Sequence, residues 1–489
     1  MPRLAPVITA VFPAIEKSDN GIGAPCGWPG ASCFPSGPGD GTPVVSHGQD
    51  SATPPVGYAA SPKAAPACHD DSRHGSMSLI PSGLIFAYGR SKIRQPTPNR
   101  MRSIESGGAM KYNVINADGH TIEPPDMWQR YMPKKFHDRI PKVVKDKKGG
   151  DAWQFYPDVP SSAIGMVTTA GKRYEDFHWY GSTYQSINKG CWDGKSRVQE
   201  MLFDGVDAEV LYPSQRTMTY FTGSDDLEFH RAGVDAYNKW IYEEFSGADH
   251  KRLIPMYQMP NLGLETAVTE LKRARKEGFR GVILTHYPSG KPNISKDDDL
   301  FWATAQEMGL PVHIHINIGG GERNAREAAI KAAQSSEDLK RLLGGIPFGN
   351  FPNACSEIIH SGVFDRYPKL KMVGVEVQAG WIPAVLAWWD DRYWRNRTMA
   401  HCELKKLPSQ YFFDNWLVTF IIDRFGVKNR HDIGVQTMMW STDYPHHGCD
   451  WPYTRKVINE MFDGVSEPEK HQILCGNAMQ LYGLKNDPE

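Results

Sequence analysis

The 489-residue sequence lacks the main features of secreted, membrane-spanning and nucleic-acid-binding proteins. Its eight cysteines include no CxxC pair, which argues against a disulfide framework and against a zinc ribbon. No stretch approaches the roughly 20 consecutive apolar residues of a membrane-spanning helix. Because Pro6 and Pro13 interrupt the short apolar run at the start, a secretory signal is weakly supported. The net charge of −1 gives no overall attraction to nucleic acid or anionic lipid. We therefore expect a cytoplasmic protein with reduced thiols and with neither membrane nor nucleic-acid partners.

The first 109 residues also lack the apolar periodicity of a folded domain. They hold 15 of the 36 prolines, amid Gly, Ser and Ala. Such a segment cannot bury enough apolar surface to offset the entropy lost on ordering. We interpret residues 1–109 as a disordered or mis-annotated N-terminal extension, and we place one folded domain at residues 110–489. Whether the extension is translated stays open, since Met110 is itself a possible start.

After Met110, short apolar or β-branched runs alternate with helical patterns. The predicted strands are Tyr112–Ala117, Asp207–Tyr212, Leu253–Gln258, Gly281–Thr285, Pro311–Ile316, Lys371–Glu376, Trp416–Phe420 and Thr437–Ser441. The helical stretches LETAVTELKRARKEG and DDDLFWATAQEMG each end on Gly just before the next strand. Alternating strands and helices imply a parallel sheet, and about eight strands favour a closed (β/α)8 TIM barrel. The irregular region from about 121 to 200 is predicted to be an insertion over the barrel mouth.

No GxGxxG motif follows the first predicted strand, which removes the main dinucleotide-binding interpretation. In a (β/α)8 barrel the active site lies instead at the carboxyl ends of the strands. These ends carry polar side chains at Asp118, His120, His286, His313, His315, Glu376 and Asp443.

Residues two apart on a strand share a face, so Asp118 and His120 point together. His313 and His315 also share a face, with His313 one layer deeper. A single Asp or His near the end of a strand is more typical of a helix cap, a turn or a packed core position. The predicted metal site therefore depends on several such residues lying at the strand ends of one barrel. Mixed nitrogen and oxygen ligands suit Zn²⁺, Mn²⁺ or Fe²⁺ better than Ca²⁺ or Mg²⁺. We predict one divalent ion, with zinc expected ahead of manganese and iron.

Six segments, in order, resemble a known family. They are INADGHTIEPPDMW, DGVDAEVLYP, GLPVHIHI, SGVFDRYPKLKMVGVEVQAGWIP, STDYPHH and ILCGNAMQLYGL. They resemble the amidohydrolase-related family of metal-dependent enzymes that includes aminocarboxymuconate-semialdehyde decarboxylase, over about residues 112 to 483. The resemblance implies a (β/α)8 barrel with one divalent metal. It implies ligands on the first, fifth and eighth strands, which fall on Asp118, His120, His315 and Asp443.

Two positions depart from the family pattern. Asp118 stands where the relatives have His or Glu, so whether it touches the metal directly stays open. Glu376 ends the sixth strand, where the decarboxylase has a catalytic His. Both side chains can carry a proton, but their unperturbed pKa values differ by about two units.

The resemblance implies, as the leading hypothesis, non-oxidative decarboxylation of a small aromatic or unsaturated acid. Glu376 would then handle the proton. Hydrolysis of an amide, ester, lactone or C–C bond is the alternative, with Glu376 or Asp443 as general base. A third interpretation is a catalytically inactive barrel that acts as a binding protein.

Candidate substrate contacts are less specific. Trp153, Tyr156, Trp179 and Tyr180 of the insertion suggest a flat ligand, although aromatic residues there are more often packing. We predict substrate contacts from the histidines His178, His286, His313 and His446. Trp388 and Trp389, on a predicted helix, can pack on the barrel or on a second subunit, and we expect a homo-oligomer, most simply a dimer.

Overall fold

The computed structural model of the chain describes residues 110–319 and 348–488. The predicted N-terminal extension, residues 1–109, lies outside the described residues. Parallel strands form the centre of the described domain: β1 (Ile115–His120), β5 (Ala208–Tyr212), β6 (Leu253–Pro255), β7 (Tyr257–Gln258), β8 (Val282–Ile283), β9 (Val312–His315), β10 (Met372–Val375), β11 (Trp416–Phe420) and β12 (Met438–Trp440).

These strands pair as two parallel sheets, β1-β5-β6 and β7-β8-β9-β10-β11-β12. Met256 alone separates β6 from β7, so the two segments are one interrupted strand. Its backbone N–H donates to the Leu211 carbonyl at 2.9 Å, on the side of β5. The next residue, Tyr257, donates to the Gly281 carbonyl at 3.0 Å, on the side of β8. This interrupted strand therefore joins the two sheets.

The second join lies between β1 and the segment that follows β12. Gly119 forms a parallel bridge with Tyr444. The Asp443 N–H donates to the Asp118 carbonyl at 2.9 Å, and the His120 N–H donates to the Tyr444 carbonyl at 2.6 Å. Since both joins are made, the eight strands close into the predicted (β/α)8 barrel.

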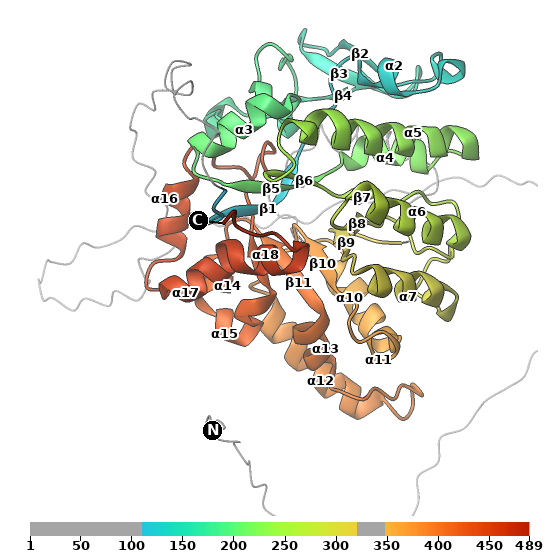
Figure 1. Ribbon diagram of the computed structural model, residues 1–489, viewed down its shortest axis with the longest axis vertical. Helices are drawn as coiled ribbons and strands as arrows, with labels where there is room; N and C mark the ends of the chain where they lie inside the picture. Colours follow the sequence, from blue (N-terminus) through green and yellow to red (C-terminus); the bar gives the residue numbers. More distant parts are fainter. Residues whose placement is uncertain (1–109, 320–347, 489) are drawn as a thin grey trace, which may run out of the picture. The chain divides into compact units, whose positions relative to one another are not determined.

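Helices follow the strands and lie around the barrel (Figure 1). They include α4 (Gln215–Thr222), α5 (Leu227–Trp240), α6 (Leu264–Glu277), α7 (Asp299–Met308), α10 (Phe351–His360), α11 (Val363–Arg366), α12 (Ile382–Asn396), α13 (Pro408–Asn415), α14 (Arg424–Lys428), α15 (Arg430–Ile433), α16 (Thr454–Met461), α17 (Glu467–His471) and α18 (Asn477–Tyr482). The glycines that end the two helices expected from sequence, Gly278 and Gly309, adopt left-handed backbone at φ 95° and 61°, which their missing Cβ permits. None of the helices within the described ranges is long and apolar enough to span a membrane.

The predicted insertion follows β1. It contains α2 (Met127–Tyr131), an antiparallel sheet of β2 (Lys142–Lys145), β3 (Asp151–Gln154) and β4 (Ser162–Ala163), and then α3 (Gly194–Phe203). Its Thr169 N–H donates to the Pro445 carbonyl at 2.9 Å, two residues after Asp443. The insertion therefore reaches the carboxyl end of the barrel.

The first strand differs from its predicted range, which began at Tyr112 and ended at Ala117. The N–H groups of Asn113 and Val114 donate to the Asp207 carboxylate at 2.8 and 2.9 Å instead of joining the ladder. Pairing with β5 then continues through His120, opposite Tyr212. As a result Asp118 and His120 belong to the strand itself rather than to the loop after it.

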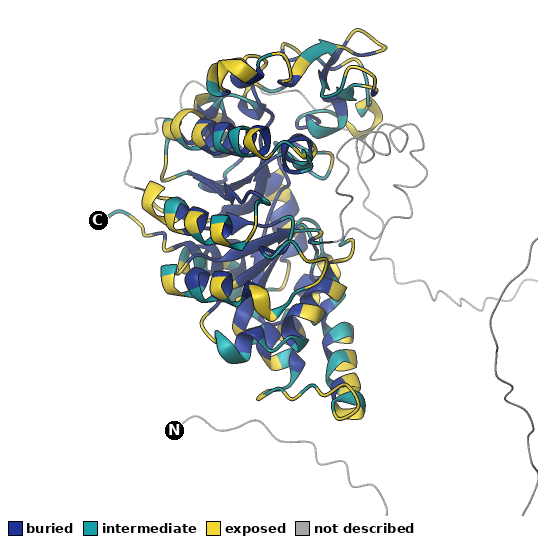
Figure 2. Ribbon diagram, turned by 90° about the vertical axis from the view of Figure 1, so that its right-hand side faces the viewer, coloured by how far each residue is buried: buried dark blue, intermediate teal, exposed yellow. Residues whose placement is uncertain are grey.

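The strands are buried on both faces (Figure 2). One cluster fills the barrel, with Ala117, Val210, Met256, Val375 and Met439 among its members. The other packs the outer face of the strands against the helices, with Leu211, Val312, Ile314, Val418 and Trp440 among its members. Successive residues of β5 alternate between these environments, as period-two side-chain geometry requires. Inward-facing positions near the strand ends therefore point at the mouth.

Candidate metal centre and active site

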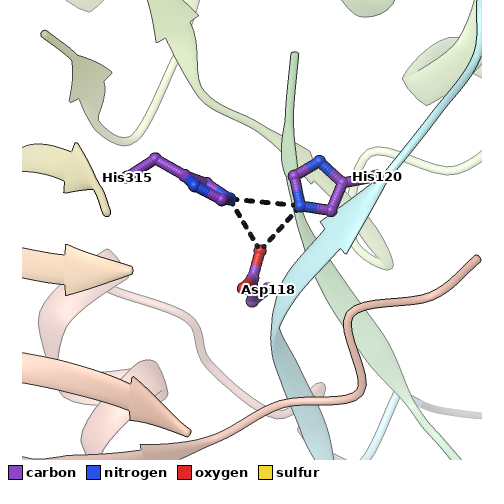
Figure 3. A group of neighbouring side chains, drawn as sticks. All are labelled: Asp118, His120 and His315. Atoms are coloured by element: carbon purple, nitrogen blue, oxygen red, sulfur yellow. Dashed lines mark hydrogen bonds and ion pairs between the residues drawn. The ribbon is translucent and has the colours of Figure 1, made fainter. Parts of the chain in front are cut away.

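Three of the four predicted ligands meet at one point above the barrel (Figure 3). The Nε2 atom of His120, on β1, lies 3.2 Å from Oδ1 of Asp118 on the same strand. The Nε2 atom of His315, at the end of β9, lies 3.2 Å from His120 Nε2 and 3.7 Å from Asp118 Oδ1. The fourth, Asp443, follows β12 and places Oδ1 3.4 Å from His120 Nε2. The sequence-predicted ligand set is therefore assembled from three strands.

These separations fit a bound cation. A tetrahedral zinc ion with bonds of about 2.0–2.1 Å holds its ligand atoms roughly 3.4 Å apart. The ligand atoms of Asp118, His120 and His315 lie 3.2 to 3.7 Å from one another, and Asp443 Oδ1 lies 3.4 Å from His120 Nε2. Neither oxygen of Asp118 nor Oδ1 of Asp443 has a hydrogen-bond partner, although both side chains are buried. Buried carboxylate oxygens without partners are costly unless a cation binds them.

Two acidic residues reach the site through unusual backbone. Glu376 directly follows β10 with φ 58°, and Asp443 follows β12 with φ 56°. Left-handed backbone is unfavourable for residues other than glycine and is often found at functional sites. At Glu376 it is held in part by the backbone N–H, which donates to Thr419 Oγ1 at 2.7 Å. The turn places Glu376 Oε2 3.9 Å from His315 Nε2, with 22% of the side chain exposed. The predicted proton carrier is therefore beside the predicted ligands.

His446 belongs to the same cluster. Its ring stacks on that of His120, and its Nδ1 lies 2.9 Å from Asp443 Oδ1. Three groups of close ligand atoms are present among the described residues: Asp118, His120 and His315; His120, Asp443 and His446; and Asp118, Glu376 and Asp443. The sequence placed His446 only as a substrate contact, but the structure also puts it within reach of the ligands.

The charged groups of the site shift one another's pKa values. Burial alone would raise the pKa of Asp118, but the neighbouring imidazoles of His120 and His315 lower it below its usual range. Burial and the charge of Asp118 raise the pKa of Asp443 to about 8, and burial with the charge of Asp443 raises that of Glu376 well above its usual value. A bound divalent cation would lower all of these pKa values, because it binds the deprotonated ligands.

The other predicted histidines are outside the three groups of close ligand atoms found among the described residues. His313 points into the barrel one layer below His315, as expected, but both of its ring nitrogens are engaged. Its Nδ1 lies 2.9 Å from the Val282 carbonyl and its Nε2 3.0 Å from the Tyr482 hydroxyl. Neither ring nitrogen of His313 is therefore left to bind a substrate, which is the role that the sequence predicted for it.

His178 is exposed on the insertion, and His286 places Nδ1 3.1 Å from Thr285 Oγ1. Neither belongs to the three groups of close ligand atoms in the described ranges. Their predicted roles in substrate binding stay predictions.

Arg197 supports the site and was missed from sequence. It is fully buried on α3, donates from Nη1 to Glu209 Oε2 at 2.5 Å, and donates from Nη2 to the His120 carbonyl. The Nε atom donates to the Gly190 carbonyl at 2.9 Å. Arginines are mostly exposed in proteins, so an arginine in the run CWDGKSRVQEML is expected on the solvent-facing side of a helix. No feature of the sequence therefore indicates that Arg197 is buried beside the site. It ties the insertion to the strand that carries two ligands.

Comparisons with known proteins agree with this architecture. A 2-amino-3-carboxymuconate-6-semialdehyde decarboxylase from Dictyostelium discoideum is 25% identical over 318 residues, covering 62% of this chain and 80% of that protein. The crystal structure of an amidohydrolase from Mycobacterium avium subsp. paratuberculosis K-10 has a TM-score of 0.58 and 20% identity, covering 77% of this chain and 100% of that chain.

A dihydroxybenzoic acid decarboxylase from Polaromonas sp. JS666, solved with manganese and the inhibitor 2-nitroresorcinol, has a TM-score of 0.51 and 17% identity. It covers 76% of this chain and 98% of that chain. At these identities the two structures establish the shared fold. The sequence itself matches the profile of the amidohydrolase family over residues 185–484, more than half of its length. The chain belongs to the amidohydrolase family, as its ordered motifs predicted.

Proposed function

We propose that this protein is a metal-dependent enzyme that removes a carboxyl group, without oxidation, from a small aromatic or unsaturated acid. The observation that carries the proposal is one cluster at the carboxyl end of the barrel. It combines the ligand atoms of Asp118, His120, His315 and Asp443 with the Glu376 carboxyl group, which is 3.9 Å from His315. The decarboxylase names of the Dictyostelium and Polaromonas proteins support the same reaction.

We assign the metal to Asp118, His120, His315 and Asp443. When bound, the ion would polarise substrate oxygens and stabilise negative charge as the C–C bond breaks. Two imidazoles and two carboxylates are ligand types that suit zinc. Manganese, which is bound in the Polaromonas structure, is the other candidate, and iron remains compatible with the ligand types.

The role proposed for Glu376 follows from its position. In a non-oxidative decarboxylation the electrons of the broken C–C bond stay on the substrate carbon, and a proton must replace the departing CO₂. Glu376 Oε2 lies at the mouth beside the ligands and would deliver that proton. No electron acceptor is needed, which agrees with the missing dinucleotide motif.

Hydrolysis is the second candidate, because Glu376 stands where the resemblance leads one to expect histidine. A carboxylate there, or Asp443, would act as general base toward a water molecule. The third interpretation, an inactive barrel, is disfavoured because the candidate ligand side chains lie close together at the site. A barrel that only binds a partner would not need these side chains to be clustered.

Turnover assays with full-length, metal-loaded protein test the proposal. We expect release of CO₂ from at least one member of a panel of hydroxybenzoates and related aromatic acids, with loss of activity after chelation. Matched amides and esters form the second panel. Hydrolysis of these without CO₂ release from any acid would replace the proposed reaction by the second candidate. Absence of both activities together with absence of bound metal would support the inactive barrel.

We also propose a homodimer. The exposed side of α12 presents Trp388 at 62% and Trp394 at 58% exposure, and Met399 just beyond the helix is 78% exposed. Large apolar side chains grouped at such exposure are typical of interfaces between proteins. Sedimentation should detect a dimer that Trp388→Lys with Trp394→Lys converts to monomer. A monomer at all concentrations would refute this assignment.

A cytoplasmic location completes the proposal. The cysteines that the structure describes, Cys191, Cys355, Cys402, Cys449 and Cys475, are all free thiols. Reduced thiols are typical of the cytoplasm. Fractionation of cells that express the natural chain would test it.

A further inference from the structure

His120 and His315 must each present Nε2 to the proposed ion, and both imidazoles turn that nitrogen toward Oδ1 of Asp118 (Figure 3). The torsion that rotates an imidazole about its Cβ–Cγ bond is broad, so the ring needs contacts that fix its direction. In most metal sites the second ring nitrogen of a ligand histidine makes a hydrogen bond that does this. The Nδ1 atom of His120 is buried and has no hydrogen-bond partner among the described residues. Packing against neighbouring rings must therefore orient this ligand.

Tyr212 packs against both ligand imidazoles. It lies directly opposite His120 on the neighbouring strand β5, and its side chain is fully buried inside the barrel. The centroid of its ring lies 6.3 Å from that of His120, with the planes inclined by 46°. It lies 5.7 Å from that of His315, edge to face at 72°. Contacts between rings at these separations prefer particular angles, because a ring has a negative face and a positive edge. Tyr212 is thus in contact with the ligands of β1 and β9 at once.

The side chain of Tyr212 crosses the interior of the barrel. Strand β5 pairs with β1 and β6, whereas β9 pairs with β8 and β10, so β5 and β9 are not neighbours. The contact between Tyr212 and His315 therefore spans the barrel rather than joining adjacent strands. The hydroxyl of Tyr212 has no hydrogen-bond partner within the part of the chain that the structure describes. The ring, and not the hydroxyl, therefore makes the contacts with the ligands.

His313, one layer below the ligands, holds the Tyr212 ring in place. The two ring centroids are 5.7 Å apart, edge to face at 64°. The Val282 carbonyl can only accept a hydrogen bond, so Nδ1 of His313 carries the proton. Burial lowers the pKa of His313 to about 4, so its ring is neutral and Nε2 accepts from the Tyr482 hydroxyl. With both nitrogens bonded, the His313 ring is fixed. Tyr212 is therefore held between one fixed imidazole and the two ligand imidazoles.

We propose that Tyr212 is a positioning residue, which fixes the imidazoles of His120 and His315 in the directions that one metal ion requires. The inference rests on the proposed function, which assigns both histidines to the metal. It extends that function by naming a side chain that contacts the ligands without binding the ion. Loss of the Tyr212 ring would leave the ligands present but free to rotate. Metal affinity should then fall, and the arrangement of ligands around the ion should change.

Metal binding by the full-length protein tests this role without requiring turnover. Zn²⁺ affinity is measured by competition with a chromophoric chelator, and the visible absorption of the Co²⁺-loaded protein reports the ligand geometry. We expect Tyr212→Leu to weaken Zn²⁺ binding about 10- to 100-fold, the usual effect of changing a residue that orients a metal ligand. The Co²⁺ spectrum should shift in the same variant. Tyr212→Phe retains the ring and should keep both the affinity and the spectrum.

Tyr112→Leu is the matched control, because Tyr112 is a buried tyrosine of the same interior cluster and its hydroxyl donates to the Lys251 carbonyl at 2.7 Å. Truncation of a buried ring should lower the Tm of both leucine variants, but Tyr112→Leu should bind Zn²⁺ as the unmodified protein does. Unchanged affinity and spectrum in Tyr212→Leu, or an equal loss in Tyr112→Leu, would overturn the positioning role. A loss in Tyr212→Phe as large as that in Tyr212→Leu would also overturn it, because the ring would then not be the cause.

If Tyr212→Leu fails to fold, Tyr212→Met takes its place with the same expected and contrary results. The failure of this inference is distinguishable from the failure of the proposed function. If the unmodified protein binds no ion, the metal site is refuted and the inference with it. If the ion binds and Tyr212→Leu weakens it while no acid releases CO₂, the proposed reaction is refuted and the positioning role is retained.

Discussion

The imidazole of His446 stacks on that of His120, with ring centroids 4.1 Å apart and planes inclined by 13°. Its Nδ1 lies 2.9 Å from Asp443 Oδ1, the carboxylate oxygen that also faces His120. One side chain thus contacts ligands from the first and the last strand of the barrel. Residues that hydrogen-bond to a metal ligand fix its orientation and its basicity.

We predict that His446→Phe weakens metal binding by about 10- to 100-fold, because phenylalanine keeps the stacking and removes the ring nitrogen that lies 2.9 Å from Asp443 Oδ1. Competition with a chromophoric chelator measures the affinity. His447→Phe is the matched control, since His447 is the adjacent histidine and lies outside the clustered ligand atoms of the described residues. Unchanged affinity would show that His446 only packs against His120. Complete loss of metal would show that His446 is itself a ligand.

Removing a direct ligand should have a larger effect. The purified protein should carry about one divalent ion per chain, and His315→Ala, Asp443→Ala and Asp118→Ala should each lose most of it. Elemental analysis of the dialysed proteins measures this, with His447→Ala as control. Asp118 is the informative member, because its two oxygens have no hydrogen-bond partner. Full metal retention in Asp118→Ala would show that this carboxylate acts through another ligand.

Much of this site could be predicted because barrel strands have short-range signatures. Short apolar or β-branched runs between helical patterns revealed β9 and β12, and the residues at or just after their ends included His315 and Asp443. The shift of β1 was not predictable, because it depends on the Asp207 carboxylate taking two backbone N–H groups about 93 residues away in sequence. The burial of Arg197 likewise depends on a distant partner. Such contacts are fixed by the closed barrel and leave no local pattern.

Arg197 gives a test of the support beneath the ligands. Its side chain and that of Glu209 are buried, so Arg197→Met leaves Glu209 charged and unpaired. Loss of one partner of a buried ion pair costs about 3–5 kcal/mol. Denaturant unfolding should show this decrease, together with weaker metal binding because the His120 carbonyl loses its donor.

Two further variants distinguish loss of the Arg197–Glu209 ion pair from loss of side-chain volume at Arg197. Adding Glu209→Gln to Arg197→Met should restore part of the free energy of unfolding, because no charge is then left buried. Arg395→Met, which breaks an exposed pair, should leave the unfolding midpoint nearly unchanged. Equal stability of Arg197→Met and the unmodified protein would remove the proposed support.

A chain that begins at Met110 should fold and bind metal like the full-length protein. The N–H of Met110 donates to Asp487 Oδ2 at 2.9 Å, and its carbonyl accepts from the Asp487 N–H at 2.8 Å. In the shortened chain the new amino group would form an ion pair with the same carboxylate. A chain that begins at Asn113 is the control, because it also removes the buried side chains of Met110 and Tyr112. Its Tm should fall, whereas loss of cooperative unfolding in the Met110 chain would show that residues 1–109 stabilise the domain.

The role of Glu376 gives the last prediction. Glu376→Gln keeps the side-chain volume and removes the group that carries the proton. If Glu376 transfers a proton to the substrate, the variant should keep its metal and its Tm while kcat falls by about 10²–10⁴. Glu376→His, which places the residue of the related decarboxylase at this position, should recover part of that activity, because an imidazole can also carry a proton.

Three outcomes distinguish the possible roles of Glu376, and each uses metal content, Tm and turnover measured on the same preparation. If Glu376 binds the metal, metal content and activity should fall together, since its carboxylate oxygen is also close to those of Asp118 and Asp443. If it serves only to hold the turn after β10, the Tm should fall while turnover is largely kept. The left-handed backbone at φ 58° makes this structural role a real alternative, because Gln would have to adopt the same conformation. Undiminished turnover in Glu376→Gln, with metal and Tm unchanged, would exclude all three roles and with them the proposed proton transfer.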